Sequence, residues 1–389
     1  MELYLLFLFL PLAFLSGWWI GRRKPGGDEP DCPDLSANYF KGLNFLLNEQ
    51  PDKAIDVFVK MLEVNSETVE THLALGNLFR RRGEGERAIR IHQNLIARPT
   101  LSRQQRELAL FELGQDYWRA GLLGRAESIL LELVEQGGSN RQGALERLLD
   151  IYQQEKDWQK AIDAVRQLDH LGARAWRPLA AQFYCELAEA ARARSDFKAA
   201  LKLLKQAHGA DRSCVRASLL QGAIEQQQGN HKAAIKALQQ VEQQDPALLP
   251  EVAAPVLESY RALGKLDQAG QYLGHLLTAY ASSSVLLAEV DVLERQQGKE
   301  AAEERIIEFL RKRPSVRGLL RLIELQLADA EGEAREDMRI LQELLKRVLQ
   351  EKAAYRCTNC GFEAKSLKWH CPGCKRWNTI RPVLGVVGE

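Results

Sequence analysis

The sequence predicts an all-α solenoid of repeated helix pairs, preceded by one membrane-spanning helix and followed by a small metal-binding domain. Three observations predict this architecture. An uncharged apolar run occupies residues 3–20, small residues recur at intervals near 34 residues between residues 54 and 302, and four cysteines form two close pairs between residues 357 and 374. The 389 residues include 53 basic and 52 acidic side chains, so the overall charge favours no polyanionic partner.

The first element is the apolar run over residues 3–20, which reads LYLLFLFLPLAFLSGWWI. As a helix it would extend roughly 27 Å, which is enough to cross the hydrocarbon core of a bilayer. Two tryptophans at 18–19 and three basic residues at 22–24 follow, so the positive-inside rule places the rest of the chain in the cytoplasm. A cleaved signal peptide is the alternative, but its basic residues would precede the apolar run. We therefore predict a retained membrane anchor over residues 1–21 and a polar linker over residues 22–34.

The second element is a series of helix–turn–helix units. A small residue recurs early in the expected second helix of each unit, at Ala54, Ala88, Ala126, Ala161, Ala200, Ala234, Ala269 and Ala302. Successive alanines are 33 to 39 residues apart, which brackets the 34-residue period of tetratricopeptide repeats. We predict an array of about eight to nine such units over residues 35–352.

Other residues keep the same register within these units. Twelve residues before four of the alanines stand Gly42, Gly76, Gly114 and Gly222, and an aromatic side chain recurs three residues further on, at Phe45, Phe79, Tyr117, Tyr152 and Tyr260. A missing side chain lets the paired helices approach closely, while the aromatic rings fill the space between units. His92 falls where a bulky side chain packs between helices, so we expect it to have a core role rather than a ligand role.

A solenoid of this kind presents a concave groove rather than a closed catalytic pocket. The repeat register places eight polar residues on first-helix positions that face this groove: Asn77, Arg80, Gln115, Arg119, Asp150, Gln153, Glu189 and Arg192. As a set they are the candidate surface for binding a peptide or protein, and a solvated helix face is the alternative for each of them. The sequence contains no P-loop, G-x-S-x-G or H-E-x-x-H motif. We therefore expect no enzymatic activity and no catalytic residues.

The last element contains two C-x-x-C pairs separated by ten residues: Cys357 with Cys360, and Cys371 with Cys374. Paired knuckles of this kind hold a metal ion in a tetrahedron of thiolates, so we predict a metal-binding domain over residues 353–389. Two disulfides or four unrelated thiols are the alternatives. The spacing leaves zinc and iron both open, because each suits four thiolates.

The surroundings of these knuckles predict further contacts. We expect Trp369 and Trp377, which flank the second knuckle, to cover the sulfurs. We also expect the metal domain to dock on the last repeat, because a helix predicted near residues 336–352 runs almost directly into it. Seven basic residues and one acidic residue lie between residues 352 and 381; near a membrane anchor they suit protein or anionic lipid better than nucleic acid, and a basic surface that serves only solubility is the alternative. The remaining cysteines, Cys32, Cys185 and Cys214, have no matching spacing and fit reduced thiols in the cytosol.

Several stretches of the chain resemble the LapB (YciM) family of lipopolysaccharide assembly proteins. They are GRR at the end of the anchor, GLNFLL (42–47), LGNLFRRRGE (75–84), RAIRIHQNL (87–95), FYCELA (183–188) and WHCPGCKRWNTIRPV (369–383). The resemblance covers essentially the whole chain. It implies a cytoplasm-facing adaptor at the bacterial inner membrane that regulates lipopolysaccharide synthesis.

The family resemblance also implies partners and a cofactor. Its members are understood to bring the deacetylase LpxC to the membrane protease FtsH, which promotes proteolysis of LpxC, and to scaffold other inner-membrane lipopolysaccharide assembly proteins. By motif match, Cys357, Cys360, Cys371 and Cys374 would bind iron or a similar metal in a rubredoxin-like domain. A membrane-tethered iron–thiolate redox sensor or electron carrier is the alternative function. Nucleic acid is not an expected partner, and the sequence leaves self-association open.

Overall fold

The computed structural model describes residue 18 and residues 35–48, 50, 53–58 and 69–389 of the chain. The predicted anchor over residues 1–21 and linker over residues 22–34 lie outside the described residues, apart from Trp18. Among the described residues, no helix combines the length and the apolar character needed to cross a bilayer.

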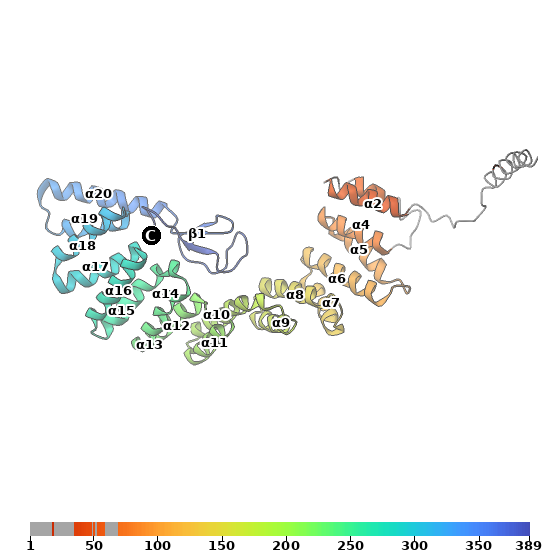
Figure 1. The fold of residues 1–389 in the computed structure, drawn as a ribbon, viewed down its shortest axis with the longest axis horizontal. Coiled ribbons are helices and arrows are strands. Elements are labelled where there is room, and N and C mark those ends of the chain that lie inside the picture. Colours follow the sequence, from red (N-terminus) through yellow and green to blue (C-terminus); the bar gives the residue numbers. More distant parts are fainter. Residues whose placement is uncertain (1–17, 19–34, 49, 51–52, 59–68) are drawn as a thin grey trace, which may run out of the picture. The chain divides into compact units, whose positions relative to one another are not determined.

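The described chain is mainly helical and divides into two compact units, residues 1–140 and 141–389 (Figure 1). Unit 1 contains α2 (Leu35–Leu47), α4 (Val69–Arg81), α5 (Gly85–Ile96), α6 (Arg103–Arg119) and α7 (Leu123–Gln136), and residues 53–58 are also helical. Unit 2 contains α8 (Arg141–Glu155), α9 (Trp158–His170), η1 (Arg174–Trp176), α10 (Arg177–Ala193), α11 (Phe197–Ala210), α12 (Val215–Gln227), α13 (His231–Gln239), α14 (Val241–Gln244), η2 (Pro246–Leu248), α15 (Pro250–Ala262), α16 (Leu266–Tyr280), α17 (Ser283–Gln297), α18 (Lys299–Lys312), α19 (Val316–Leu327) and α20 (Gly332–Glu351). Within each unit, successive helices pack as the pairs that the repeat spacing predicts.

Close approach within the pairs depends on the small residues of the repeat. All eight register alanines, from Ala54 to Ala302, are fully buried. A Cβ atom added at Gly76 would lie 2.4 Å from Nε2 of His92, and one added at Gly222 would lie 2.6 Å from the side chain of Leu238. Only glycine therefore fits opposite these bulky neighbours. The core role predicted for His92 is confirmed, because its side chain is buried against the helix of Gly76.

A turn with one left-handed residue joins the two helices of most pairs. Gly83, Gly121, Gly229 and Gly264 adopt positive φ in this turn, and each lies five residues before a register alanine. At the corresponding places of two other units stand Lys156 (φ 58°) and Ser195 (φ 62°). A side chain with Cβ is strained in this conformation, so these two turns are less favourable than the glycine turns.

The C-terminal domain is a small three-stranded sheet with long connections. Its strands are β1 (Tyr355–Cys357), β2 (Glu363–Ala364) and β3 (Ile380–Pro382), in the order β2-β1-β3 with both pairings antiparallel. Tyr355 pairs with Ala364 on one side and with Pro382 on the other. Such short strands form few backbone hydrogen bonds with one another, so the domain needs further interactions to stay folded.

The metal domain lies inside the curve of the unit 2 helices (Figure 1) and contacts them from α8 to α19. The expected docking on the last repeat is present through α19, but the domain also contacts earlier repeats, which the sequence did not indicate. Tyr355 Oη donates a hydrogen bond to Glu251 of α15, Arg381 forms a 2.9 Å ion pair with Asp245, and the Val316 N–H donates to the carbonyl of Val386. The short link after α20 leaves the domain free to return over earlier repeats, where partners of opposite charge are available.

The last residue also fixes the domain to the repeats. The carboxylate of Glu389 accepts hydrogen bonds from the hydroxyl of Ser282, from the backbone N–H of Ser284 and from Arg317 at 2.7 Å. Ser282 is the N-cap of α17, so this carboxylate sits at a helix N-terminus, where negative charge is favoured.

Candidate metal centre

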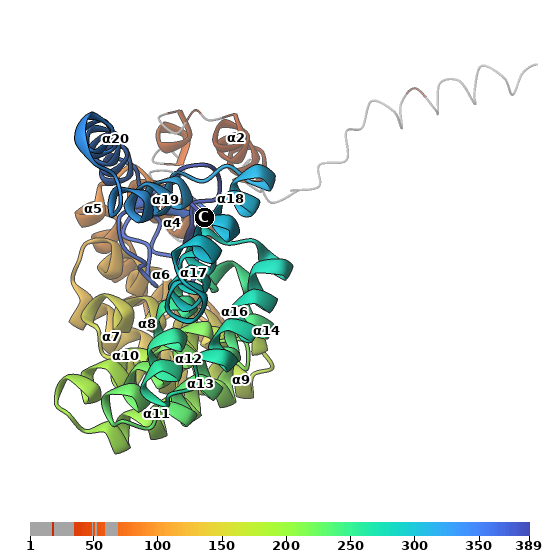
Figure 2. The ribbon, with the colours of Figure 1, turned by 90° about the vertical axis from the view of Figure 1, so that its left-hand side faces the viewer.

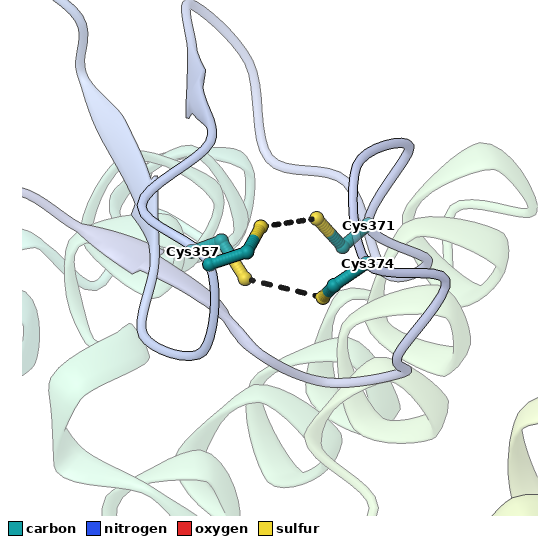
Figure 3. A group of neighbouring side chains, drawn as sticks. Cys357, Cys371 and Cys374 are labelled. Carbon is teal, nitrogen blue, oxygen red and sulfur yellow. Dashed lines mark hydrogen bonds between the residues drawn. The ribbon is translucent and has the colours of Figure 1, made fainter. Parts of the chain in front are cut away.

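Four cysteine sulfurs converge at the centre of the C-terminal domain. Cys357 ends β1 and Cys360 follows in the next turn, while Cys371 and Cys374 belong to a second turn. The four Sγ atoms all lie within 4.8 Å of one another. Figure 3 shows Cys357 facing Cys371 and Cys374 across the site. The Sγ–Sγ distance is 3.7 Å from Cys357 to Cys374 and 3.6 Å from Cys360 to Cys371. The predicted four-cysteine site is therefore present.

The spacing of the sulfurs fits a tetrahedrally coordinated ion. A tetrahedron with metal–sulfur bonds of about 2.3 Å has edges of about 3.8 Å, close to the observed distances. Four thiolates form a closed structural site, with no coordination position left for water or substrate. The donor set suits zinc and iron alike.

The two knuckles share one backbone conformation. In the first, the Gly361 N–H donates to the Cys357 carbonyl at 3.0 Å; in the second, the Lys375 N–H donates to the Cys371 carbonyl at 2.9 Å. Gly361 (φ 77°) and Lys375 (φ 58°) are both left-handed. A glycine is therefore used in one knuckle and a strained lysine in the other.

At two of the four sulfurs, those of Cys357 and Cys374, hydrogen bonds favour the thiolate form that a metal requires, whereas the pKa of Cys360 is raised to about 11. Cys357 Sγ lies 3.3 Å from the hydroxyl oxygen of Thr379. This contact, followed by the backbone N–H groups of Cys360 and Asn359, lowers the pKa of Cys357 to about 6. The backbone N–H of Arg376 similarly lowers the pKa of Cys374.

The two tryptophans do not cover the sulfurs, so this expectation was wrong. Instead Ile380 is buried with Cys357 and Cys371, and Phe362 packs against them. Trp369 packs against the core of the later unit 2 repeats. These indoles gain more from the aromatic and apolar surface of the repeats than from the small interior of the metal domain.

Trp377 joins the metal domain to the helices α8, α9 and α10 and to Arg216. Its ring lies 6.0 Å from that of Trp158 and 5.8 Å from that of Phe183, edge-on to both, and the guanidinium of Arg216 lies 5.8 Å away over its face. Its indole N–H donates a 2.9 Å hydrogen bond to the side-chain oxygen of Gln153. The N–H is therefore satisfied while the ring is packed.

The eight candidate groove residues are distributed over both units. In unit 1, Arg80 is paired with Glu112 and Asp116, Asn77 accepts a hydrogen bond from Arg80, and Gln115 donates one to Glu112. Arg119 is exposed. Arg80 therefore links the neighbouring first helices α4 and α6, whereas the bonds of Asn77 and Gln115 lie within their own helices. The role of all four in partner binding stays a prediction.

In unit 2, two of the candidates contribute to holding the metal domain. Gln153 accepts the hydrogen bond from Trp377, and Glu189 forms a 3.0 Å ion pair with Arg216, which lies over Trp377. The other two have contacts within the repeats: Asp150 is paired with Arg147, and Arg192 donates to Gln227. This part of the groove binds the chain's own C-terminal domain.

Cys185 and Cys214 form a thiol pair that sequence spacing did not indicate. Their Sγ atoms lie 3.9 Å apart, and both side chains are buried. They come from α10 and from the residue before α12, so only the packing of those helices joins them. Cys32 lies outside the described residues.

Stacked helix pairs and a four-thiolate domain define this chain as a tetratricopeptide-repeat protein with a rubredoxin-like metal domain. Family models agree: residues 71–107 and 185–248 match the tetratricopeptide repeat, and residues 355–382 match the rubredoxin metal binding domain. A solved structure of Naa15/Naa10 bound to HypK-THB is similar over 82% of this chain and 48% of that chain, with 15% identity and a TM-score of 0.46.

The chain belongs to the lipopolysaccharide assembly protein B family. It is 41% identical to "Lipopolysaccharide assembly protein B" of Escherichia coli (strain K12) over 388 residues, which are 99% of this chain and 100% of the relative. It is 36% identical to the protein of the same name from Haemophilus influenzae over 390 residues, covering 97% of this chain and 98% of the relative.

Proposed function

We propose that this chain is a non-enzymatic adaptor of lipopolysaccharide assembly, tethered to the bacterial inner membrane by residues 1–21 with its repeats in the cytoplasm. The observation that carries the proposal is the full-length similarity to lipopolysaccharide assembly protein B. The repeat architecture supports it, because stacked helix pairs provide extended surfaces for other proteins rather than a closed reaction site.

The adaptor would act on the deacetylase LpxC by bringing it to the membrane protease FtsH. The membrane anchor confines the repeats to a thin layer beside other inner-membrane proteins. Confinement raises the effective concentration of a bound client near the protease, so no chemical step by the adaptor is needed. Lipopolysaccharide output would then be restrained through the amount of LpxC.

The docked metal domain narrows the choice of client surface. It contacts helices of unit 2 from α8 to α19, including the candidate residues Gln153 and, through Arg216, Glu189. We therefore assign the client to the first helices of unit 1, where Arg119 is exposed. When bound, the metal ion would stabilise the small C-terminal domain, because in such domains the free energy of ion binding contributes directly to the free energy of folding.

The test is turnover of LpxC in cells that express the chain without residues 1–21. We expect the truncated protein to fold and bind LpxC but to leave LpxC long-lived. Replacing residues 1–21 by an unrelated single-span anchor is the matched control, and it should restore degradation. Undiminished LpxC turnover with the soluble form would rule out the tethering mechanism.

A further inference from the structure

The final helix of the array is α20 (Figure 2), and it carries an exposed apolar stripe. None of its residues is buried, and the side chains of Ile340, Leu341, Leu344 and Val348 are 52%, 50%, 50% and 39% exposed. Their spacing of three to four residues places them along one side of the helix, over about 12 Å of its length. Contiguous apolar surface of this kind marks an interaction site more often than a solvated face.

The repeat register identifies the counterpart of this stripe in earlier units. The residue seven positions after the register alanine is 0–8% exposed in every preceding unit from α5 onward: Leu95, Leu133, Leu168, Ala207, Val241, Leu276 and Phe309. In α20 the small residue at the corresponding place near the helix start is Ala334, and Leu341 follows seven positions later. Ala334 is exposed, unlike the eight register alanines, and Leu341 is half-exposed, so this side of α20 is not covered as it is in the seven preceding units.

The difference arises from the element that succeeds each second helix. Within unit 2, α9 packs against α10, α13 against α15, α16 against α17 and α18 against α19, so each second helix is covered by the first helix of the next pair. After α20 the chain passes directly to β1 at Tyr355. The final helix of a solenoid normally has a polar outer face, whereas the exposed side of α20 carries four large apolar side chains.

The charges beside the stripe indicate the character of a partner. On a helical projection, Glu333, Asp337 and Glu351 border the apolar side chains, and Arg347 is the basic residue nearest to them. All four are exposed. A partner that covers the stripe would therefore gain from basic residues beside its own apolar face.

We propose that α20 binds an amphipathic helix of another protein, with basic residues flanking its apolar side, in the place that the first helix of a further repeat would occupy. This site is separate from the client surface assigned to unit 1. The exposed position of all four apolar side chains means that substituting them leaves the packing of α19 and α20 intact.

The first experiment is site-specific photocrosslinking in cells that express the full chain. A photoreactive residue at position 344 should crosslink to a segment of a different protein that mass spectrometry identifies as an amphipathic helix with flanking lysines or arginines. Position 350, on the opposite side of α20, is the control and should give no such product. A crosslink only to a second copy of the chain, or none above the control, overturns the proposal.

The second experiment measures binding of a defined probe. A fluorescent 20-residue leucine–alanine helix with lysines beside its apolar face should bind the purified protein at least tenfold more tightly than the same helix with glutamates. L341S/L344S should weaken binding of the lysine probe at least tenfold, while Q350S should leave it unchanged. Equal affinities of L341S/L344S and Q350S, with unchanged melting curves, overturn the proposal.

Discussion

At the scale of single residues, the fold depends on glycines, because their lack of a side chain lets paired helices approach closely. Gly222 faces the buried Leu238 so closely that an added Cβ would lie 2.6 Å from it. We expect Gly222→Ala to lower the free energy of unfolding by about 1–3 kcal/mol, because the paired helices must separate. Gly209→Ala is the control in an open helical position of α11, and it should raise stability by about 0.5–1 kcal/mol. Chemical denaturation of both variants measures the difference, and equal effects would contradict the packing argument.

The turn within each helix pair gives a second prediction at this scale. Lys156 occupies a left-handed position that glycine occupies in four other units. Lys156→Gly should stabilise the protein by about 0.5–1 kcal/mol, because it removes the strain of a Cβ in this conformation. Lys156→Ala keeps the strain and should give no gain. Thermal unfolding of the two variants distinguishes strain from loss of the lysine charge.

The lowered pKa of His208 predicts how the stability of the protein depends on pH. Burial lowers its pKa, and among the described residues its Nε2 atom has no hydrogen-bond partner. As the pH falls through about 6.5, the unfolded chain takes up a proton that the folded state resists, so stability declines. His208→Gln should show a shallower decline in urea unfolding between about pH 7.5 and 5.5. If the unfolding free energies of both proteins depend on pH in the same way, His208 does not cause the decline.

At the scale of elements, the metal domain depends on both its ion and its docking surface. Cys357→Ser and Cys374→Ser should each abolish metal retention, because a four-thiolate site loses a ligand. The helices should persist, since each repeat is stabilised by its neighbours. Elemental analysis together with circular dichroism measures both effects. Full metal content in both variants would contradict the assigned ligands.

Trp377 provides the corresponding test of docking. Trp377→Ala removes contacts to Trp158, Phe183 and Gln153, and we expect a loss of about 3 kcal/mol in unfolding free energy. Proteolysis should then release the C-terminal domain faster, while metal content remains complete. Lys365→Ala, at an exposed position of the same domain, should behave like the parent protein. Equal protease resistance of both variants would mean that Trp377 does not hold the domain in place.

Features that depend on local sequence spacing could be predicted from the sequence, whereas contacts between distant elements could not. Alanine spacing predicted the helix pairs because each pair is a local unit whose register is visible along the chain. The cysteine spacing predicted the metal site for the same reason. The docking of Trp377 could not be predicted, because its partner Gln153 lies 224 residues away. Cys185 and Cys214 were missed in the same way, since they come together only through helix packing.

At the scale of the whole molecule, the two units use the surfaces of their repeats differently. Unit 1 joins its first helices through the Arg80 network with Glu112 and Asp116. Unit 2 binds the metal domain along its inner curve and ends in the apolar stripe of α20. Under the two proposals above, a client binds unit 1 and a helical partner binds α20, which would give an adaptor two separate binding surfaces.

The Trp377–Gln153 and Tyr355–Glu251 contacts have a consequence for how the protein unfolds. They join residues near the C-terminus to helices that are synthesised much earlier, α8 and α15. Repeats in a solenoid contact only their neighbours, so these long-range contacts couple repeats that would otherwise unfold separately. Since the ion would supply much of the order of this small domain, we expect a chain whose four cysteines hold no ion to lose these long-range contacts.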